Sequence, residues 1–487
     1  MLPNRHRCRS FVAPFAAAAA LIAVALVAIP VASAQSKNSS GTIPETVAAP
    51  ELTNSRFDED YSYLRDPANR TGAWWEPFKY MPLDASGDVY LTLGQEFRLR
   101  EEAYWNFNWG EVPIDNYQWY RFMPYADLHL GPNLRLFGQL AGAWAAGKET
   151  GDTGVDETGF DLLQGFVEVK LPLEDDADLT LRGGRQLLSY GSERLISLRY
   201  GPNVLRSFDA GLASGRTGPW RIDAFYARPV KNETKNFDDR SDDGRSVWSL
   251  YGTRKLDEFS ARSGLDLYYI GYHNAHAAFN QGTGEESRQT LGSRFFGAMQ
   301  GWDWNYEGMF QFGSFNGGDI LAWSVASDTG YTLTNLPFSP RIGLKANIIS
   351  GDQSPNKSGL QTFNPLFPKG KYFGEIGLIG PSNLINLHPS LTLHLNEQWT
   401  LQGAAIYYWR ESLGDGVYDA GGNVVRSAGQ SDSRYIGTQA DVVLSWQPLR
   451  WLSAELDSSV FVPGHFIEDT GPAKTAYFAG VETVVKF

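Results

Sequence analysis

Histidines and nucleophile motifs, which carry much of hydrolytic chemistry, are sparse in this sequence of 487 residues. The seven histidines form no H-E-x-x-H pair, and no serine stands in a G-x-S-x-G context. His273 and His276 fall where a loop is expected to begin, which fits surface residues better than metal ligands. The sequence therefore predicts no catalytic, metal-binding or cofactor-binding residue, and an enzyme with a hydrolytic site is a remote alternative.

Arginine points to a different chemistry, because its guanidinium binds carboxylates through paired hydrogen bonds and stays charged at any relevant pH. Cationic side chains recur on the polar positions of segments in which apolar and polar residues alternate. We expect them to line a path for a charged solute: Arg98, Arg100, Arg121, Arg135, Arg182, Arg221, Arg288, Arg294, Arg341 and Lys345. Arg185 falls on the apolar positions of its segment and joins this path only if a bulge at Gly183-Gly184 turns it inward.

Acidic residues occupy polar positions of the same segments, which leaves a second interpretation open. They are Glu96, Asp127, Glu168, Asp223, Asp303, Glu307, Asp441, Glu455, Asp457 and Glu482. Acids and bases on one face can pair with each other and form a solvated wall, or they can form a selective ring for a charged solute. The alternation by itself favours the wall for any single residue.

The alternating segments that carry these charges are predicted to be β-strands with one apolar and one polar face. In residues 302–312, Trp302, Trp304, Tyr306, Phe310 and Phe312 share one face, and residues 399–409 repeat the pattern. The ends of such a segment are about 25 Å apart along a membrane normal when the strand tilts. This height matches the apolar band of a transmembrane barrel, although a soluble β-sandwich would show the same alternation in any one strand.

From residue 89 onward we count 18 such strands, or 16 if two boundaries are misplaced. Long connections alternate with short ones, which is typical of an antiparallel up-and-down barrel in an outer membrane and not of a sandwich. An even strand number places both termini in the periplasm. Phe487, on the outer face of the last strand, resembles the signal that the barrel-assembly machinery reads. Pro124 and Pro389 fall within strands, where we expect bulges.

The N-terminal region is expected to lie outside the barrel. Residues 1–34 combine three arginines, an apolar run and the small residues Ala32-Ser33-Ala34, which predicts a signal peptide, with a membrane-anchor helix as the alternative. Residues 35–88 then form a periplasmic extension and residues 89–487 the barrel. Without the three arginines of the signal peptide, the net charge changes from −13 to −16, so a nucleic acid is not expected as a partner.

Several segments together resemble the alginate export family of outer-membrane proteins over residues 57–487. These are Asp58-Glu59-Asp60-Tyr61 with Leu64-Arg65-Asp66-Pro67, Asp127-Leu128-His129-Leu130-Gly131-Pro132, Arg182-Gly183-Gly184-Arg185-Gln186, Gly201-Pro202-Asn203-Val204, Phe363-Asn364-Pro365-Leu366-Phe367-Pro368-Lys369-Gly370 and Gly380-Pro381-Ser382-Asn383-Leu384. The resemblance implies a monomeric 18-stranded barrel through which an anionic polysaccharide diffuses. It also implies that Arg182 and Arg185 line an electropositive pore.

These observations predict an outer-membrane channel for anionic saccharides, in contact with the lipid bilayer and without a cofactor. The balance of acids and bases keeps a general porin, or a porin for another solute, as the alternative. The connection from Ser350 to Leu384 is the longest, and we expect it either to fold into the pore or to cap it from outside.

Overall fold

The computed structural model describes residues 49–173, 177–354 and 358–487. The predicted signal peptide, residues 1–34, and the first part of the predicted extension lie outside the described residues. Among the helices that are described, none has the length and apolar character needed to cross a membrane.

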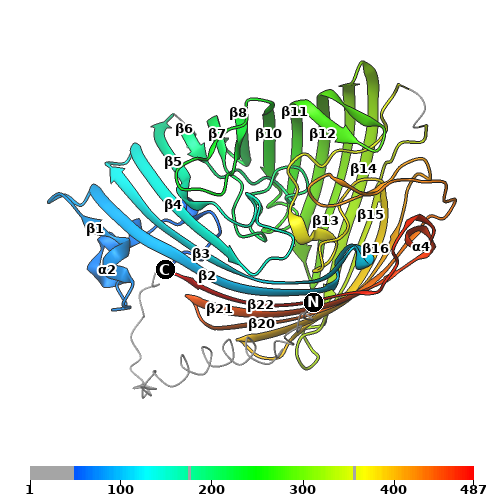
Figure 1. The fold of residues 1–487 in the computed structure, drawn as a ribbon. Coiled ribbons are helices and arrows are strands. Elements are labelled where there is room, and N and C mark those ends of the chain that lie inside the picture. The colour runs from blue at the N-terminus through cyan, green and yellow to red at the C-terminus, as the bar shows by residue number, and fades with distance from the viewer. Residues whose placement is uncertain (1–48, 174–176, 355–357) are drawn as a thin grey trace, which may run out of the picture. The chain divides into compact units, whose positions relative to one another are not determined.

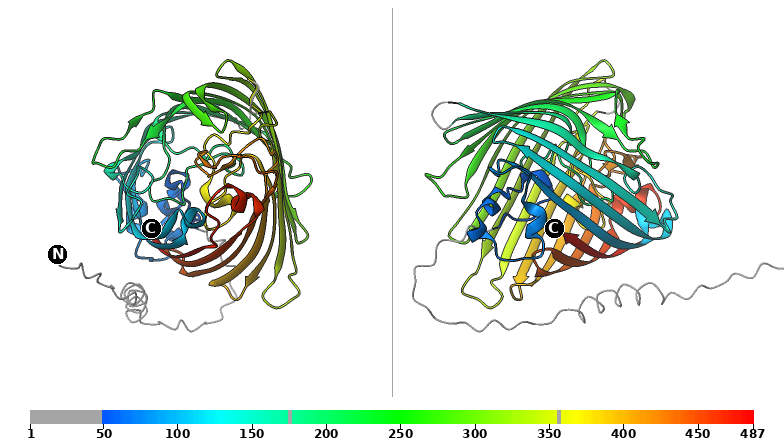
Figure 2. Two further views of the ribbon diagram at one scale, coloured as in Figure 1. Left: turned by 45° about the vertical axis from the view of Figure 1, so that its right-hand side comes forward. Right: turned by 90° about the vertical axis from the view of Figure 1, so that its left-hand side faces the viewer.

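Eighteen antiparallel strands form a closed barrel (Figure 1, Figure 2). The first barrel strand pairs with the last, from Glu96 opposite Lys486 to Trp105 opposite Tyr477. The strands are β2 (Val89–Asn106), β3 (Val112–Leu130), β4 (Leu134–Ala146), β5 (Gly159–Pro172), β6 (Asp178–Gln186), β7 (Phe208–Thr217), β8 (Trp220–Lys231), β10 (Arg245–Lys255), β11 (Gly264–Phe279), β12 (Gly282–Met299), β13 (Trp302–Phe315), β14 (Gly318–Thr332), β15 (Arg341–Ile349), β16 (Leu384–His394), β17 (Trp399–Trp409), β20 (Tyr435–Leu449), β21 (Leu452–Pro463) and β22 (Ala476–Lys486). The predicted fold class and strand number are confirmed.

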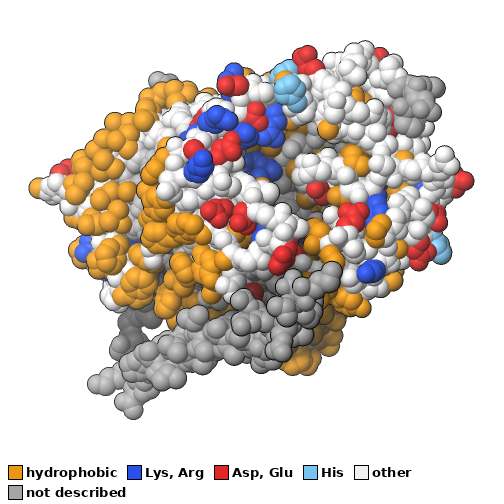
Figure 3. Space-filling model, in the orientation of Figure 1, with side chains coloured by type: hydrophobic (Ala, Val, Ile, Leu, Met, Phe, Trp, Pro, Cys, Tyr) orange, Lys and Arg blue, Asp and Glu red, His pale blue; other side chains and the backbone are white. Residues whose placement is uncertain are grey.

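The barrel is apolar outside and polar inside, as the alternation predicts. On β13, Trp302 and Phe310 are 53% and 44% exposed on the outer face, whereas Gln311, which follows Phe310, is fully buried. The space-filling view shows hydrophobic side chains spread over the outer wall (Figure 3). This arrangement is the inverse of a soluble sandwich, whose apolar faces turn toward each other.

One end of the barrel, here called the turn side, carries short connections such as 131–133, 218–219 and 300–301. The other end, the loop side, carries the long connections 187–207, 350–383 and 410–434. Two connections expected to be long are two-residue turns, 280–281 and 316–317, because β11 to β14 extend further than the apolar pattern indicates. His273 and His276 consequently lie within β11 and not at the start of a loop.

Pro124 and Pro389 are accommodated without the expected bulges. Pro124 stays in register opposite Gln95 of β2, and the pairing with β4 skips two positions and resumes in the same register. Pro389 lies opposite Leu344 of β15, and the pairing with β17 likewise resumes unshifted. Each proline therefore interrupts the ladder toward one neighbour only, which is all that the loss of its N–H requires.

The barrel interior is filled from both ends (Figure 2). From the loop side, connection 187–207 and the described residues of connection 350–383 fold into the lumen and pack with wall residues in one large apolar cluster that includes Ile196, Phe208, Phe363 and Phe367. The longest connection thus folds into the barrel, one of the two outcomes expected for it. The shorter loop-side elements are α3 (Phe107–Gly110), β9 (Arg240–Ser241), η4 (Gly370–Phe373), β18 (Val417–Tyr418), β19 (Val424–Arg426) and α4 (His465–Thr470).

At the turn side, residues 49–88 fold as an N-terminal segment against the mouth of the barrel (Figure 1, Figure 2). The segment consists of η1 (Arg56–Asp58), η2 (Ser62–Arg65), η3 (Pro67–Asn69), α2 (Glu76–Lys79) and β1 (Met81–Pro82). Strand β1 pairs with β2, so the segment continues directly into the barrel wall.

Candidate functional site in the barrel lumen

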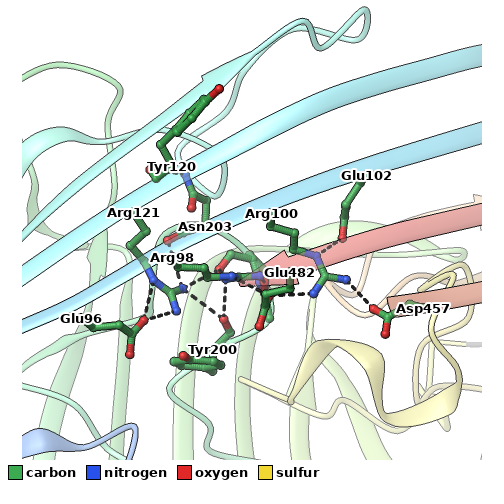
Figure 4. A network of polar contacts seen from close by, with 12 residues as sticks. Glu96, Arg98, Arg100, Glu102, Tyr120, Arg121, Tyr200, Asn203, Asp457 and Glu482 are labelled. Carbon is green, nitrogen blue, oxygen red and sulfur yellow. Dashed lines mark hydrogen bonds and ion pairs between the residues drawn. The ribbon is translucent and has the colours of Figure 1, made fainter. Parts of the chain in front are cut away.

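Two of the predicted lumen arginines are covered by a loop (Figure 4). Arg98 on β2 donates hydrogen bonds to the carbonyls of Tyr200, Gly201 and Pro202, at 2.6–3.2 Å. Arg121 on β3 donates to the carbonyls of Tyr200, Pro202 and Asn203, at 3.2–3.4 Å. Because backbone carbonyls take up these guanidinium donors, Arg98 and Arg121 hold connection 187–207 against the wall.

Carboxylates complete the environment of these buried cations. Arg121 pairs with Glu96 at 2.5 Å, with both side chains fully buried. Arg98 and Arg100 share Glu482, at 2.7 and 2.8 Å. Arg100 also pairs with Glu102 and Asp457, at 2.6 and 2.9 Å. A buried charge is tolerated when it is paired, and each cation of this network has a carboxylate partner, as the self-paired wall of the two interpretations requires.

The Gly201-Pro202-Asn203-Val204 motif provides most of the carbonyls that Arg98 and Arg121 bind, and it is itself anchored to the wall. The Asn203 side chain is fully buried, and its amide donates to the carbonyls of Tyr120, Trp144 and Asp156, at 2.9–3.2 Å. Asn364 of the Phe363–Gly370 motif and Asn383 of the Gly380–Leu384 motif also anchor their loop through side-chain hydrogen bonds. The Asn364 amide donates to Glu286 on β12, and the Asn383 amide donates to the carbonyls of Ser412 and Gly416. These motifs are therefore docking points of loops.

The two inward loops meet inside the barrel. The Phe367 N–H donates to the Leu195 carbonyl and the Lys369 N–H to the Glu193 carbonyl, each at 2.9 Å. Arg194 pairs with Glu307 of β13 at 2.6 Å, and its guanidinium lies 4.8 Å from the centre of the Tyr372 ring. Both loops are thus tied to each other and to the wall, which narrows the lumen.

A polar cavity of about 590 Å³ remains between these loops and the wall strands β12 to β20. Four cations face it: Arg294, Lys345, Lys369 and Lys371. Lys345 forms no ion pair within 4 Å among the described residues, whereas Lys371 lies 3.3 Å from Glu375. Burial raises the pKa of Glu375, and the charge of Lys371 opposes this shift.

A second polar cavity, of about 620 Å³, lies at the turn side between the N-terminal segment and strands β3 to β8. Arg135, Arg182 and Arg221 face it. Arg135 pairs with Asp127 at 2.6 Å, Arg182 donates to Glu168 at 2.7 Å, and Arg221 pairs with Asp223 at 2.9 Å while its side chain stays 50% exposed. Tyr190 of connection 187–207 also lines this cavity and donates to Asp223. Arg135 and Arg182 are 14% and 12% exposed, so Arg221 is the guanidinium that is most open to the cavity.

The remaining predicted residues lie elsewhere. Arg341 is at the turn-side end of β15, where it pairs with Asp303 at 2.5 Å. Arg185 stays in register opposite Gly165, and its position has the parity of Leu181, so it lies on the outer face and not in the lumen. Gly184 has a φ of 133°, but it adds no residue to the strand and does not turn Arg185 inward. Arg185 pairs there with Asp209 at 2.8 Å.

Sequence reasoning missed the cations that loops bring into the lumen, namely Arg194, Lys369 and Lys371. Strand alternation gives no information on residues in irregular segments. Lys369 lies within the Phe363–Gly370 motif, and this position was the one signal available for it.

Comparison with solved structures gives the fold. OccK2 (OpdF) of Pseudomonas aeruginosa, solved in complex with glucuronate, is 12% identical, covers 84% of this chain and 99% of its own, and has a TM-score of 0.54. OpdO of the same species is 10% identical over 82% of this chain and 97% of its own, with a TM-score of 0.55. OpdK of the same species, solved with vanillate, is 9% identical over 81% of this chain and 98% of its own, with a TM-score of 0.55.

Comparison with curated proteins gives no match. The sequence model described as alginate export matches residues 89–481, which is most of the chain and nearly all of the barrel. The closed 18-stranded barrel and this match identify an outer-membrane channel, and the chain belongs to the alginate export family.

Proposed function

We propose that the protein is a passive channel for small anionic saccharides, such as uronates and short uronate oligomers. The observation that carries this proposal is the turn-side cavity, which Arg135, Arg182 and Arg221 line together. Guanidinium groups bind carboxylates in a bidentate manner, and a cavity of this size is in the range of small-molecule sites, about 300–1,000 Å³.

The central cavity is mixed in charge, because Glu193, Asp328, Glu375 and Asp441 line it together with its four cations, and Lys345 is the one of these cations without an ion pair among the described residues. Lys345, Lys369 and Lys371 face a polar space in which hydroxyl groups of a sugar find many partners, including Gln402 and Asn305. Glucuronate, with which OccK2 was solved in complex, belongs to the same chemical class. The inward loops favour a short solute, because a long polymer would require connections 187–207 and 350–383 to move.

The proposal is tested by reconstituting the purified protein in planar bilayers. Reversal potentials in sodium glucuronate gradients should indicate anion selectivity, and the double variant Arg182→Gln, Arg221→Gln should shift them toward cation selectivity. Each single variant, Arg182→Gln or Arg221→Gln, should shift them in the same direction, and Arg185→Gln, which removes one charge from the outer face, is the matched control for these single variants. Cation-selective currents that neither uronates nor the double variant alter would instead support a general porin.

The length of the solute is tested in the same bilayers. Uronate monomers and dimers should permeate, whereas a long polyuronate should be excluded. Passage of the polymer through the wild-type channel would favour polysaccharide transport, the function that the family resemblance implies.

A further inference from the structure

The N-terminal segment is bound to both sides of the barrel seam. Arg56, fully buried, donates to the carbonyls of Gln95 on β2 and Phe487 after β22, at 3.3 and 3.1 Å. Gln95 and Phe487 also form two backbone hydrogen bonds with each other, at 2.9 and 3.1 Å. The segment is therefore attached where barrel closure brings the two edge strands together.

Phe57, the next residue, inserts into the wall beside the arginines of the turn-side cavity. Its ring packs edge-on against Phe137 and Phe166, with centroids 6.0 and 5.5 Å away. The Arg182 guanidinium lies 4.3 Å from the Phe57 ring centre, and Arg135 donates to the Phe57 carbonyl at 2.6 Å. Two of the three cavity arginines thus contact the segment directly.

Asp58 then directs a carboxylate toward the same cavity. Its side chain lines the space that Arg135, Arg182 and Arg221 face, although it forms no ion pair within 4 Å among the described residues. Burial raises the pKa of Asp58, and the charges of these three arginines oppose that shift. A carboxylate that shares a cavity with three guanidiniums lies in the kind of environment that the carboxylate of a uronate requires.

The rest of the segment packs on the barrel through a small buried cluster, in which Tyr61, Leu64 and Tyr80 lie with Tyr90 of β2, and through contacts that are weak or costly. The ion pair between Arg65 and Asp88 is about half exposed on both sides, and such pairs contribute little. Lys79 is buried beside the Tyr125 hydroxyl, and burial lowers its pKa to about 7. Because a buried lysine without a carboxylate partner opposes docking, and Lys79 has none among the described residues, it lowers the cost of displacing the segment.

We propose that residues 49–88 are a plug at the turn side of the channel, and that Asp58 is a built-in competitor of the solute carboxylate for Arg135, Arg182 and Arg221. An anionic solute that enters the cavity takes over these guanidiniums and releases the plug. The competition rests on the proposed function, whereas the closing of the mouth by the segment does not depend on it.

A nitroxide label at Ala68→Cys reports release of the plug in the full chain, with the single native cysteine, Cys8, replaced by serine. Ala68 is exposed in η3 and away from the cavity. Millimolar sodium glucuronate should increase the mobility of the label, and glucuronamide, a neutral analogue added with sodium chloride, should not. Unchanged mobility with glucuronate would overturn the competition.

Variants separate the plug from the competitor. Phe57→Ala should increase the single-channel conductance in potassium chloride several-fold, and an unchanged conductance would overturn the plug. Asp58→Asn should increase the affinity for glucuronate, measured by calorimetry, by roughly fivefold. Glu51→Gln, an exposed acid of the same segment, is the control and should leave both quantities unchanged.

The outcomes distinguish this inference from the proposed function. If glucuronate permeates while Phe57→Ala and Asp58→Asn behave as wild type, the channel function holds and the plug is refuted. If Phe57→Ala raises the conductance but glucuronate neither binds nor permeates, the saccharide function and the competition both fail.

Discussion

Two groups of arginines on neighbouring inward positions of one barrel differ in what covers them. Arg98 and Arg121 on β2 and β3 are capped by the carbonyls of residues 200–203 and by buried carboxylates. Arg182 and Arg221 on β6 and β8 also have carboxylate partners, but they face a cavity. Residue type and strand parity are the same in both groups, so the difference lies in the loop carbonyls, which take up the donors of Arg98 and Arg121 and leave those of Arg221 facing a cavity.

This difference gives each group its own expected signature. Loss of a capped arginine should affect stability first, because its partners are buried and lose their compensation. Loss of a cavity arginine should affect ion selectivity first, because water can replace the missing side chain.

The largest effect is expected for Arg121→Met. This change leaves Glu96 buried without its closest partner, which costs about 3–5 kcal/mol, and it frees the carbonyls of connection 187–207. The folded, heat-modifiable form should melt at a markedly lower temperature, and a protease should cleave within residues 187–207. Adding Glu96→Gln should recover part of the loss, because the unpaired charge is then removed. If Arg121→Met alone melts at the wild-type temperature and residues 187–207 stay uncleaved, Arg121 is not a loop anchor.

Arg221→Gln should change ion selectivity more than stability, which is the opposite of the result expected for Arg121→Met. The Arg221 side chain is 50% exposed and its pair with Asp223 is solvated, so the stability should change by at most about 1 kcal/mol. The reversal potential in a salt gradient should nevertheless shift toward cation selectivity. If the melting temperature falls as far as in Arg121→Met while selectivity stays constant, the distinction between the two groups is lost.

Much of this architecture could be predicted from the sequence, because strand alternation reports directly on the two faces of a barrel. The alternation in β13 and β17 gave the transmembrane barrel, and it also placed Arg182 and Arg221 in the lumen. It could not indicate that carbonyls of Tyr200 and Pro202 would cover Arg98 and Arg121, because this contact joins residues about 80–100 positions apart through an irregular loop. Such contacts depend on the three-dimensional path of the loop.

The N-terminal segment shows the same limit. Residues 35–88 were predicted to be an extension because they lack periodicity, yet residues 49–88 bind the barrel through single residues such as Arg56 and Phe57. A contact made by one side chain at a time leaves no repeating pattern in the sequence.

A third, smaller effect concerns pH at the turn side. Burial lowers the pKa of Lys79 to about 7, with further lowering by Arg56 and Arg450 and opposition from Glu59 and Asp127. The undocked segment has the ordinary pKa of 10.5 and binds more protons between pH 7 and 10.5. Docking should therefore become more favourable as the pH rises through this window, by at most about 1.4 kcal/mol per pH unit.

The label at Ala68→Cys measures this effect through its mobility at pH 6.5 and pH 9. Mobility should decrease at the higher pH in the wild-type background and should be independent of pH in Lys79→Met. Lys255→Met, at an exposed position of β10, is the control and should behave as wild type. Equal mobility of the wild type at both pH values would mean that Lys79 does not oppose docking.

The smallest effect is expected for Arg185→Gln, which sharpens the comparison within a single motif. Arg182 and Arg185 are three residues apart, so the two-residue period of a strand places them on opposite faces. Arg185 pairs with the partly exposed Asp209 near the loop-side end of β6, and its loss should change stability by less than about 1 kcal/mol. Conductance and reversal potential should match those of the wild type. A selectivity change as large as that of Arg182→Gln would show that charge near the rim, and not access to the lumen cavity, governs which ions enter.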